Sequence, residues 1–355
     1  MKQRRQSKRI MLGNVAVGGD APITVQSMTK TDTRDVRATV EQIAGLVDAG
    51  CDIVRLAVPD LEAASALAEI RACATVPLVA DIHFDHRLAL AAMDAGVDGL
   101  RLNPGNIRRH EDLERVVLRA KERQVPIRIG VNGGSLPSDY QPEGTLPERM
   151  VAIAEEQIAV LESLDFDLVK VSLKASDVQA TVDAYVLMAD RSPYPLHLGV
   201  TEAGPPMCGA IRNAMGMGIL LHLGIGDTIR VSMSGDPLLE VDAGRETLAS
   251  LGLRDAGPRI VSCPTCGRTT LDVPGIAARV AEYTRAIREP LHIAVMGCVV
   301  NGPGECGQSD VGIAGGVGKV AVYRGGAFAY SVPVDEAFET LKTEIDALVE
   351  SRQRE

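Results

Sequence analysis

Residues 52–56 read DIVRL and residues 98–102 read DGLRL, two short aliphatic runs that each hold a single arginine. Neither run alternates strictly between apolar and polar residues, which is typical of strands buried on both faces of a sheet. The segment at residues 36–50 carries apolar residues at helical spacing, as do the other segments between runs. Similar aliphatic runs recur at residues 23–27, 76–80, 127–131, 168–173, 196–200 and 228–232.

Eight strand–helix units in this order predict a TIM (β/α)8 barrel, an α/β fold in which one parallel sheet closes on itself. Gly50 and Gly96 follow two predicted helices and Asp60 can cap a third, so the helix ends agree with this interpretation. The alternative is an open, doubly wound sheet. Closure is favoured because no glycine-rich nucleotide-binding turn follows the first strand.

The composition changes after the last of these units. Glycine, proline and cysteine become dense in CPTCG at residues 263–267 and MGCVVNGPGECG at residues 296–307. We therefore predict two domains, a barrel at residues 1–252 and a smaller α+β domain at residues 258–355. GGVGK at residues 315–319 matches a phosphate-binding loop only in part, and we expect a hairpin turn there.

Composition narrows the functional classes. The 355 residues are 46% hydrophobic and 24% charged, which suits a chain with a buried core. A net charge of −10, an aromatic content of 3% and the lack of tryptophan argue against nucleic-acid binding. No apolar run reaches the roughly 18 residues of a membrane span. No apolar signal segment follows the basic residues 2–9, which we expect to form a solvated tail.

Several predicted strands carry one cation among aliphatic residues, namely Arg55, Arg101, Arg128, Lys174 and Arg230. A cation inside a barrel is unfavourable unless it meets an anion. One alternative is that internal carboxylates pair with these side chains. The other is a doubly phosphorylated or diphosphate ligand, because guanidinium groups bind phosphate oxygens in pairs. The repetition of the pattern in an acidic chain favours the ligand.

Active sites of barrels lie at the carboxyl ends of the strands. The polar residues predicted there are Asp81, His83, Asn103, Asn132, Glu202 and Ser232. Each alone could instead cap a helix or satisfy a loop. Glu202 is the candidate proton donor or orienting group, because a carboxylate among cations stays ionised until substrate excludes water. Lys170 and His197 are expected to be interior structural residues.

Seven cysteines without a secretion signal indicate a reducing, cytoplasmic location. Cys51, Cys73 and Cys208 are expected to be small core residues. The other four lie within 44 residues near the C-terminus and suggest a metal site: Cys263, Cys266, Cys298 and Cys306.

This cysteine spacing suits either an iron–sulfur cluster or a structural zinc ion. The second cysteine pair lies in CVVNGPGEC, whose spacing is poor for zinc. Its Gly/Pro-rich loop can supply backbone N–H groups to sulfur, which favours the cluster. Zinc remains the alternative, and from spacing alone Cys306 would be the natural fourth ligand.

The chain also resembles a known family. The shared motifs are VQSMT from Val25, VADIHFD from Val79, RLNPGNI from Arg101, RIGVN from Arg128, KVSLKASD from Lys170, GVTEAG from Gly199, GIGDTIRVS from Gly224, CPTCGR from Cys263 and MGCVVNGPGE from Met296. The last is very specific. With these motifs the chain resembles the bacterial, two-domain type of the 4-hydroxy-3-methylbut-2-en-1-yl diphosphate synthase family, which belongs to the methylerythritol phosphate pathway.

The resemblance implies the reductive ring opening and dehydroxylation of 2-C-methyl-D-erythritol 2,4-cyclodiphosphate in isoprenoid biosynthesis. Two electrons would arrive singly through a 4Fe–4S cluster, from a flavodoxin or ferredoxin. The four arginines and Lys174 would meet the substrate phosphates, with His83 and Ser232 nearby, while Asn132 and Glu202 would face the reacting carbons. The resemblance also implies a homodimer in which the cluster domain of one chain caps the barrel of the other.

In the resembled family, three cysteines and a glutamate hold the cluster, which here are Cys263, Cys266, Cys298 and Glu305. Cys306 stands directly after Glu305, where a small residue is expected. We favour Glu305 because a weak carboxylate ligand can leave and open one iron to substrate, whereas four thiolates would close the cluster. The rival hypotheses are a zinc-stabilised barrel, such as a pterin-type transferase, and a non-catalytic phosphate-binding protein.

Overall fold

The structure is a computed structural model that describes residues 1–103, 106–107, 109–136, 143–255 and 257–354. The chain divides into two compact units, Met1–Arg254 and Asp255–Glu355. Pro104 and Gly105 of the RLNPGNI motif, and Ala256 between the two predicted domains, lie outside the described residues. Within the described ranges, no helix is both long enough and apolar enough to cross a membrane.

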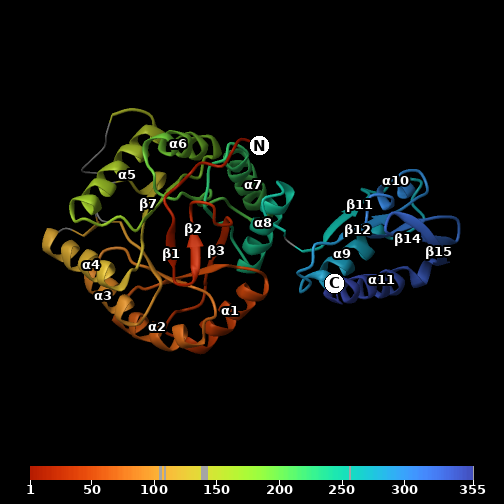
Figure 1. The fold of residues 1–355 in the computed structure, drawn as a ribbon, viewed down its shortest axis with the longest axis horizontal. Helices are drawn as coiled ribbons and strands as arrows, with labels where there is room; N and C mark the ends of the chain where they lie inside the picture. The colour runs from red at the N-terminus through yellow and green to blue at the C-terminus, as the bar shows by residue number, and fades with distance from the viewer. Residues whose placement is uncertain (104–105, 108, 137–142, 256, 355) are drawn as a thin grey trace. The chain divides into compact units, whose positions relative to one another are not determined.

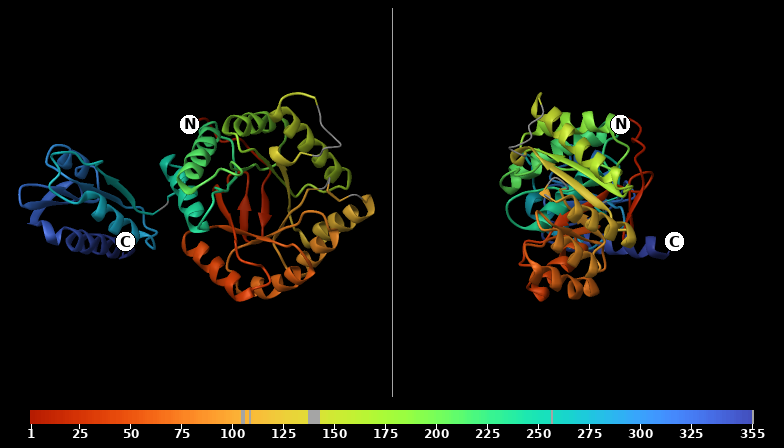
Figure 2. Two further views of the ribbon diagram at one scale, coloured as in Figure 1. Left: turned by 180° about the vertical axis from the view of Figure 1, so that it is seen from behind. Right: turned by 90° about the vertical axis from the view of Figure 1, so that its left-hand side faces the viewer.

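Eight parallel strands form the main sheet of the first unit, in the order β8-β7-β6-β5-β4-β3-β10-β9 (Figure 1). A parallel bridge between Val171 and Leu196 joins the two ends of this order, so the sheet closes and the predicted TIM barrel is confirmed. Helices ring the strands (Figure 2). The strands are β3 Thr24–Met28, β4 Ile53–Ala57, β5 Leu78–Asp81, β6 Gly99–Arg101, β7 Ile127–Asn132, β8 Val169–Lys174, β9 His197–Leu198 and β10 Thr228–Ile229. The helices are α1 Val36–Asp48, α2 Leu61–Cys73, α3 His86–Asp94, α4 His110–Arg123, α5 Leu146–Ser163, α6 Val178–Arg191, α7 Pro206–His222 and α8 Pro237–Ser250, with a 3-10 turn η2 at Gly133–Ser135.

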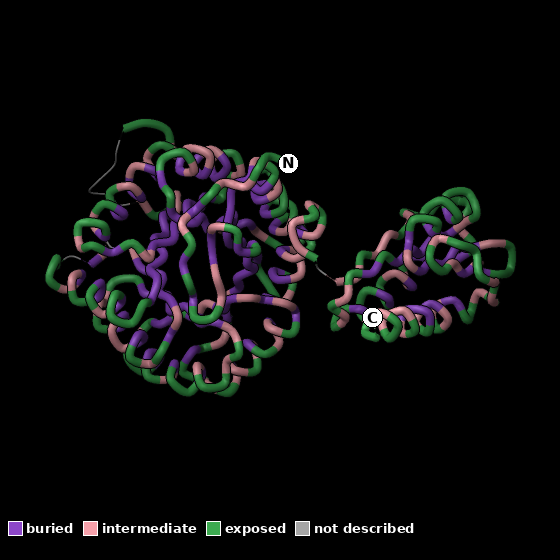
Figure 3. Tube along the Cα trace, viewed as in Figure 1, coloured by how far each residue is buried: buried purple, intermediate pink, exposed green. Residues whose placement is uncertain are grey.

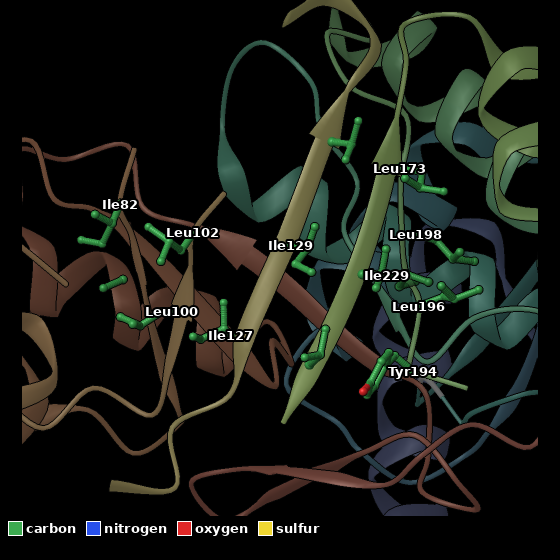
Figure 4. Close-up of a cluster of buried hydrophobic side chains, with 14 of the residues drawn as sticks. Ile82, Leu100, Leu102, Ile127, Ile129, Leu173, Tyr194, Leu196, Leu198 and Ile229 are labelled. Carbon is green, nitrogen blue, oxygen red and sulfur yellow. The ribbon is translucent and has the colours of Figure 1, made fainter. Parts of the chain in front are cut away.

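Alternation along the strands decides which side chains face the barrel interior. Leu100 and Leu102, which flank Arg101, belong to a large buried apolar cluster that the strands share with the helices (Figures 3 and 4). Ile127 and Ile129 repeat the pattern on β7. Because neighbouring side chains on a strand point to opposite faces, the arginine between two such residues points into the barrel. The aliphatic neighbours therefore fix the direction of each cation.

The amino end of the barrel is covered by a short hairpin of β1 (Ile10–Leu12) and β2 (Val15–Val17). Apolar residues of this hairpin pack against Ile53 and Val79 at the beginnings of two barrel strands. Leu12 is only 2% exposed. The hairpin thus closes one end of the barrel and leaves the carboxyl end for the site.

The basic residues before the hairpin are bound to the barrel. The Arg5 guanidinium donates to the carbonyl oxygens of Ala189 and Tyr194, at 2.8 Å and 3.2 Å. Arg4 forms an ion pair with the buried Asp227 at 2.9 Å. The expectation of a solvated tail is therefore wrong, because loops at the amino end of the barrel offer acceptors that the arginines reach.

A five-stranded mixed sheet forms the second unit, in the order β11-β12-β13-β14-β15. Helices α9 and α11 pack on the face that carries Ile293 and Val295, and α10 packs on the face that carries Ala294 and Met296. The predicted α+β domain is confirmed, and residues 315–319 form the expected hairpin between β13 and β14. The elements are β11 Arg259–Ser262, α9 Val273–Thr284, β12 His292–Met296, α10 Gly302–Cys306, β13 Val311–Gly315, β14 Lys319–Arg324, β15 Ala327–Pro333, a 3-10 turn η3 Val334–Glu336 and α11 Ala337–Arg354.

Three cysteines lie outside the C-terminal group. Cys51 is 3% exposed and is a core residue, as expected. Cys73 ends α2 and Cys208 lies on α7, and both are exposed, so the expectation is wrong for these two. Their helices turn these positions away from the sheet.

Candidate active site

Two arginines from neighbouring strands meet one carboxylate at the carboxyl end of the barrel. Nε of Arg55 on β4 lies 3.7 Å from the Asp81 carboxylate on β5. Nη1 of Arg101 on β6 lies 3.3 Å from the same carboxylate, and Asp81 and Arg101 are direct register partners. Both of these partners are less than a tenth exposed. The predicted cations are thus partly paired inside the protein.

Arg230 at the end of β10 meets a second buried carboxylate, Glu240 of α8, at 3.3 Å. Glu240 also lies 3.2 Å from Nζ of Lys30 and accepts a hydrogen bond from the Ser27 hydroxyl. Sequence reasoning missed Glu240. Its signal is that an acidic residue stands on the buried face of α8, one position before the core residue Val241.

Arg128 and Lys174 have no ion-pair partner in the part of the chain that the structure describes, although both are buried. Nη1 of Arg128 donates to the Ser172 hydroxyl, and its Nε makes no hydrogen bond. Glycines leave room for such side chains. A Cβ at Gly130 would lie 3.0 Å from Nε of Arg101, and a Cβ at Gly199 would lie 2.8 Å from Nζ of Lys174.

Burial and mutual repulsion dominate the electrostatics of this mouth. Burial alone would raise the pKa of Asp81, yet the Arg55 and Arg101 guanidinium groups hold that pKa below its usual range. Burial, with neighbouring cations, lowers the pKa of Arg230 to about 10 and the pKa of Lys174 well below its ordinary value. The same causes lower the pKa of Arg128, but a guanidinium keeps its charge.

The internal-carboxylate alternative therefore holds for part of the cation set only. Arg55 and Arg101 share Asp81, and Arg230 shares Glu240 with Lys30. Among the described residues, the five predicted cations and Lys30 thus have only these two carboxylates as ion-pair partners, and Arg128 and Lys174 pair with neither. An excess of buried positive charge is unstable unless an anion neutralises it. The mouth can thus bind a multiply charged anion.

The remaining predicted residues surround the cations. Nδ1 of His83 lies 3.0 Å from Nη1 of Arg101, and burial lowers the pKa of His83, so the ring is neutral at pH 7. The Ser232 hydroxyl donates to the Val200 carbonyl at 2.6 Å and keeps its lone pairs for another donor. Asn103, two residues beyond β6, is half-buried.

Glu202 is exposed and follows β9 in the left-handed backbone region, with φ of 52°. That conformation costs about 1 kcal/mol for a residue other than glycine, and such strain collects at functional sites. A Cβ placed on Gly134 would lie 4.0 Å from its carboxylate oxygen. Glu202 therefore extends toward η2, which begins directly after Asn132. The two predicted catalytic residues of the barrel lie at one part of the mouth.

The candidate metal ligands of the second unit stand at one edge of its sheet. Cys263 directly follows β11 and Cys298 follows β12, and these strands are parallel neighbours. The Gly297 N–H donates to Sγ of Cys263 at 3.3 Å. Backbone N–H groups of Val300 and Asn301 lower the pKa of Cys298. Such donors stabilise thiolates.

Cys306 and Glu305 differ sharply in position. The Cys306 side chain is fully buried and packs with Ala294, Met296 and Ala314 on the sheet face that α10 covers. Glu305, one residue earlier on the same short helix, is exposed. A ligand at an accessible sheet edge needs an accessible side chain, so burial argues against Cys306.

The donor set fits an iron–sulfur cluster by its chemistry. Three thiols lie on two adjacent loops at one edge, and backbone N–H groups point at two of their sulfur atoms. Within the described ranges, no three or more His, Cys, Asp or Glu side chains are gathered closely enough to hold a metal ion. The structure thus brings the cysteines to one edge without arranging them around one point.

A closed barrel with a cation-lined mouth, joined to a small domain with cysteines at a sheet edge, defines a two-domain enzyme that acts on an anionic substrate. The GcpE TIM-barrel domain model matches residues 7–245 and the GcpE protein C-terminal domain model matches residues 259–347. The chain belongs to this family, so the resemblance seen in its motifs is confirmed.

Relatives extend over essentially the whole chain. The 4-hydroxy-3-methylbut-2-en-1-yl diphosphate synthase (flavodoxin) of Dehalococcoides mccartyi strain CBDB1 is 57% identical over 98% of this chain and 100% of its own length. The enzyme of the same name from Geobacter sulfurreducens is 51% identical over 98% of this chain and 99% of its own. The chain is therefore an enzyme of this isoprenoid-pathway oxidoreductase family.

Two solved structures resemble about two thirds of the chain. A dihydropteroate synthase from Yersinia pestis superposes with a TM-score of 0.52 and 10% identity, over 69% of this chain and 98% of its own. The Xanthomonas albilineans dihydropteroate synthase with 7,8-dihydropteroate gives a TM-score of 0.51 and 15% identity, over 69% and 98%. At such low identity the likeness concerns the fold and does not revive the transferase hypothesis.

Proposed function

We propose that this chain reduces 2-C-methyl-D-erythritol 2,4-cyclodiphosphate to 4-hydroxy-3-methylbut-2-en-1-yl diphosphate. The main observation in support is the excess of buried cations at the barrel mouth, in a chain whose relatives bear the name of that product. Two electrons and one proton are consumed. The C2–O bond of the ring breaks, its oxygen stays on the diphosphate, and the C3 hydroxyl leaves as water.

The diphosphate is held by the cations, in this proposal. Arg128, whose Nε has no hydrogen-bond partner, and Lys174 bind phosphate oxygens directly, while Arg55, Arg101 and Arg230 exchange part of their contact with carboxylates for contact with phosphate. Asp81, His83, Asn103 and Ser232 line the same mouth as substrate-binding residues. These fixed charges stabilise the diphosphate as its oxygen is released from C2.

Glu202 and Asn132 act at the reacting carbons. Glu202 holds the proton that leaves with the C3 oxygen, and the amide of Asn132 orients that oxygen. Support comes from their shared position at one side of the mouth and from the left-handed backbone of Glu202.

The proposed cofactor is a 4Fe–4S cluster held by Cys263, Cys266, Cys298 and Glu305. When bound, it supplies electrons one at a time, from a flavodoxin or a ferredoxin. The exposed Glu305 is preferred to the buried Cys306 because a carboxylate is a weaker ligand that substrate can replace.

The proposed assembly is a homodimer in which the second unit of one chain caps the barrel of the other. The exposed face of α7 supports self-association, since apolar side chains recur on it every four residues. These are Met207, Ile211, Met215 and Ile219, with 75%, 51%, 56% and 43% of their surfaces exposed. The cytoplasmic location indicated by the cysteines remains a prediction.

Metal content and turnover test this function together. The full chain, purified without oxygen, should contain iron and sulfide in about equal amounts. With dithionite as reductant, it should convert the cyclic diphosphate to the linear product. A colourless protein that contains zinc, or one that binds the substrate without reducing it, would refute the proposal.

A further inference from the structure

A second group of polar side chains lies inside the barrel, beneath the mouth. Lys170 of β8, His197 of β9 and Gln26 of β3 are each no more than 2% exposed. A small cavity of about 10 Å³, the chamber, borders Lys170, Gln26 and Arg128, and Leu12 of the amino-end hairpin also lines it. Lys170, His197 and Gln26 are not among the proposed substrate contacts, whereas Arg128 belongs to both groups.

These side chains have too few partners for buried polar groups. Both ring nitrogens of His197, Oε1 of Gln26 and Nε of Arg128 lack a hydrogen bond. Nζ of Lys170 has one acceptor, the Thr228 hydroxyl, at the long distance of 3.5 Å. A cavity of this size holds about one water molecule, which needs two to four polar partners. The chamber offers such partners, so it can solvate a proton.

The charges around Lys170 connect this chamber to the mouth. Arg128 of β7 faces Lys170 and repels its charged form, while Asp227, next to β10, attracts it. Asp227 is already bound to Arg4 and Ser7, which weakens that attraction. Burial is the largest effect, and together these lower the pKa of Lys170 to about 7.

His197 stands among the same cations. Burial is the largest cause that keeps its pKa well below the ordinary value, and Lys174, Arg128, Lys170 and Arg55 add repulsion. His197 is thus a neutral ring. Of the two side chains, Lys170 is therefore the one whose protonation changes near neutral pH.

We propose that Lys170 is an internal proton acceptor, which takes up a proton when a diphosphate occupies the barrel mouth. The inference rests on the proposed function of the mouth. A bound diphosphate neutralises Arg128, and this removes repulsion that disfavours a charged Lys170. Ligand and proton then bind cooperatively, and each strengthens the other by the same factor.

Calorimetry of inorganic pyrophosphate binding to the full chain tests this. At pH 8, titrations in buffers of different ionisation enthalpy give the number of protons taken up on binding. Lys170→Met keeps the volume of the side chain and removes its titration. Lys121→Met, at an exposed lysine of α4 that pairs with Asp165, is the matched control. Because the variants are compared at one pH, the protons that pyrophosphate itself gains or loses on binding cancel in the difference.

The wild-type chain and Lys121→Met should take up roughly one-half to one proton more than Lys170→Met. From pH 7 to pH 9, their affinity should decline more steeply than that of Lys170→Met, by about threefold to tenfold per pH unit. Equal proton uptake by wild type and Lys170→Met, with pyrophosphate bound by both, would overturn the role of Lys170. The assignment of the mouth would then stand. If neither pyrophosphate nor the cyclic diphosphate bound to the wild-type chain, the mouth and the chamber would both lose their assignment.

Discussion

The barrel mouth and the cysteine edge hold their reactive groups in opposite ways. In the mouth, the cations stand on strands, are buried or nearly so, and are partly fixed by Asp81 and Glu240. At the edge, Cys266 and Glu305 are exposed, and the thiols receive mainly backbone hydrogen bonds. The mouth is organised by the protein itself.

This difference indicates which of the two regions depends on its ligand for its geometry. A preorganised site keeps its geometry when its ligand is removed, whereas a metal site on exposed loops gains order from the metal. Changes at the edge should therefore abolish reduction and leave anion binding intact. Changes to the cations of the mouth should weaken anion binding and leave the iron content intact.

The largest effect is expected for Cys298→Ala. Loss of one thiolate ligand should remove most of the iron and lower reductive turnover by at least about a thousandfold. The affinity for pyrophosphate, measured by calorimetry, should stay at the wild-type value. Cys208→Ala, at an exposed cysteine of α7, is the control that should change neither. Retained turnover in Cys298→Ala would show that this cysteine is not a ligand.

Arg128→Met should weaken pyrophosphate binding by about a hundredfold, or ~2.7 kcal/mol, because a charge-assisted phosphate contact is lost. Its thermal stability should be unchanged or higher, since Arg128 has no ion-pair partner among the described residues and its burial is unfavourable. Iron content should not change. Arg119→Met, at a surface arginine that pairs with Asp94, is the control. An unfolded Arg128→Met chain would instead assign this arginine a structural role.

Glu202→Gln should lower the turnover rate by about tenfold to a hundredfold, the usual contribution of a positioned proton donor. Binding of the cyclic diphosphate should change little, because the cations hold the phosphates. Glu156→Gln on the exposed face of α5 is the matched control. Turnover of Glu202→Gln at the wild-type rate would remove Glu202 from the proton step.

Much of the mouth could be predicted because the local sequence pattern decides which way a strand side chain points. An arginine between two aliphatic strand residues that pack against the helices must point to the opposite face, and this predicts the direction of Arg101 between Leu100 and Leu102. The partner of Arg230 could not be predicted, because Glu240 lies on a helix ten residues later, and only the packing of α8 brings the two together. The direction of a strand side chain is set by the local sequence, whereas its ion-pair partner is not.

The wrong expectations for the N-terminal segment and for the two exposed cysteines have the same cause, since each depends on packing that the local sequence does not show. The basic N-terminal segment looks solvated in sequence, yet the acceptors of Arg5 are carbonyl groups nearly two hundred residues away. Backbone carbonyls carry no sequence signature. Cys73 and Cys208 are exposed although both were predicted to lie in the core, because their exposure depends on how each helix is rotated.

Cys306→Ala carries the smallest predicted effect and separates the two candidates for the fourth ligand. Since its side chain is fully buried against Ala294, Met296 and Ala314, removing the sulfur should destabilise the second unit by about 1 kcal/mol. Iron content and turnover should stay near the wild-type values. Glu305→Ala should show the opposite pattern, with a normal unfolding temperature and impaired turnover. If Cys306→Ala lost iron as Cys298→Ala does, the buried thiol would have to reach the sheet edge, and the ligand set would be four cysteines.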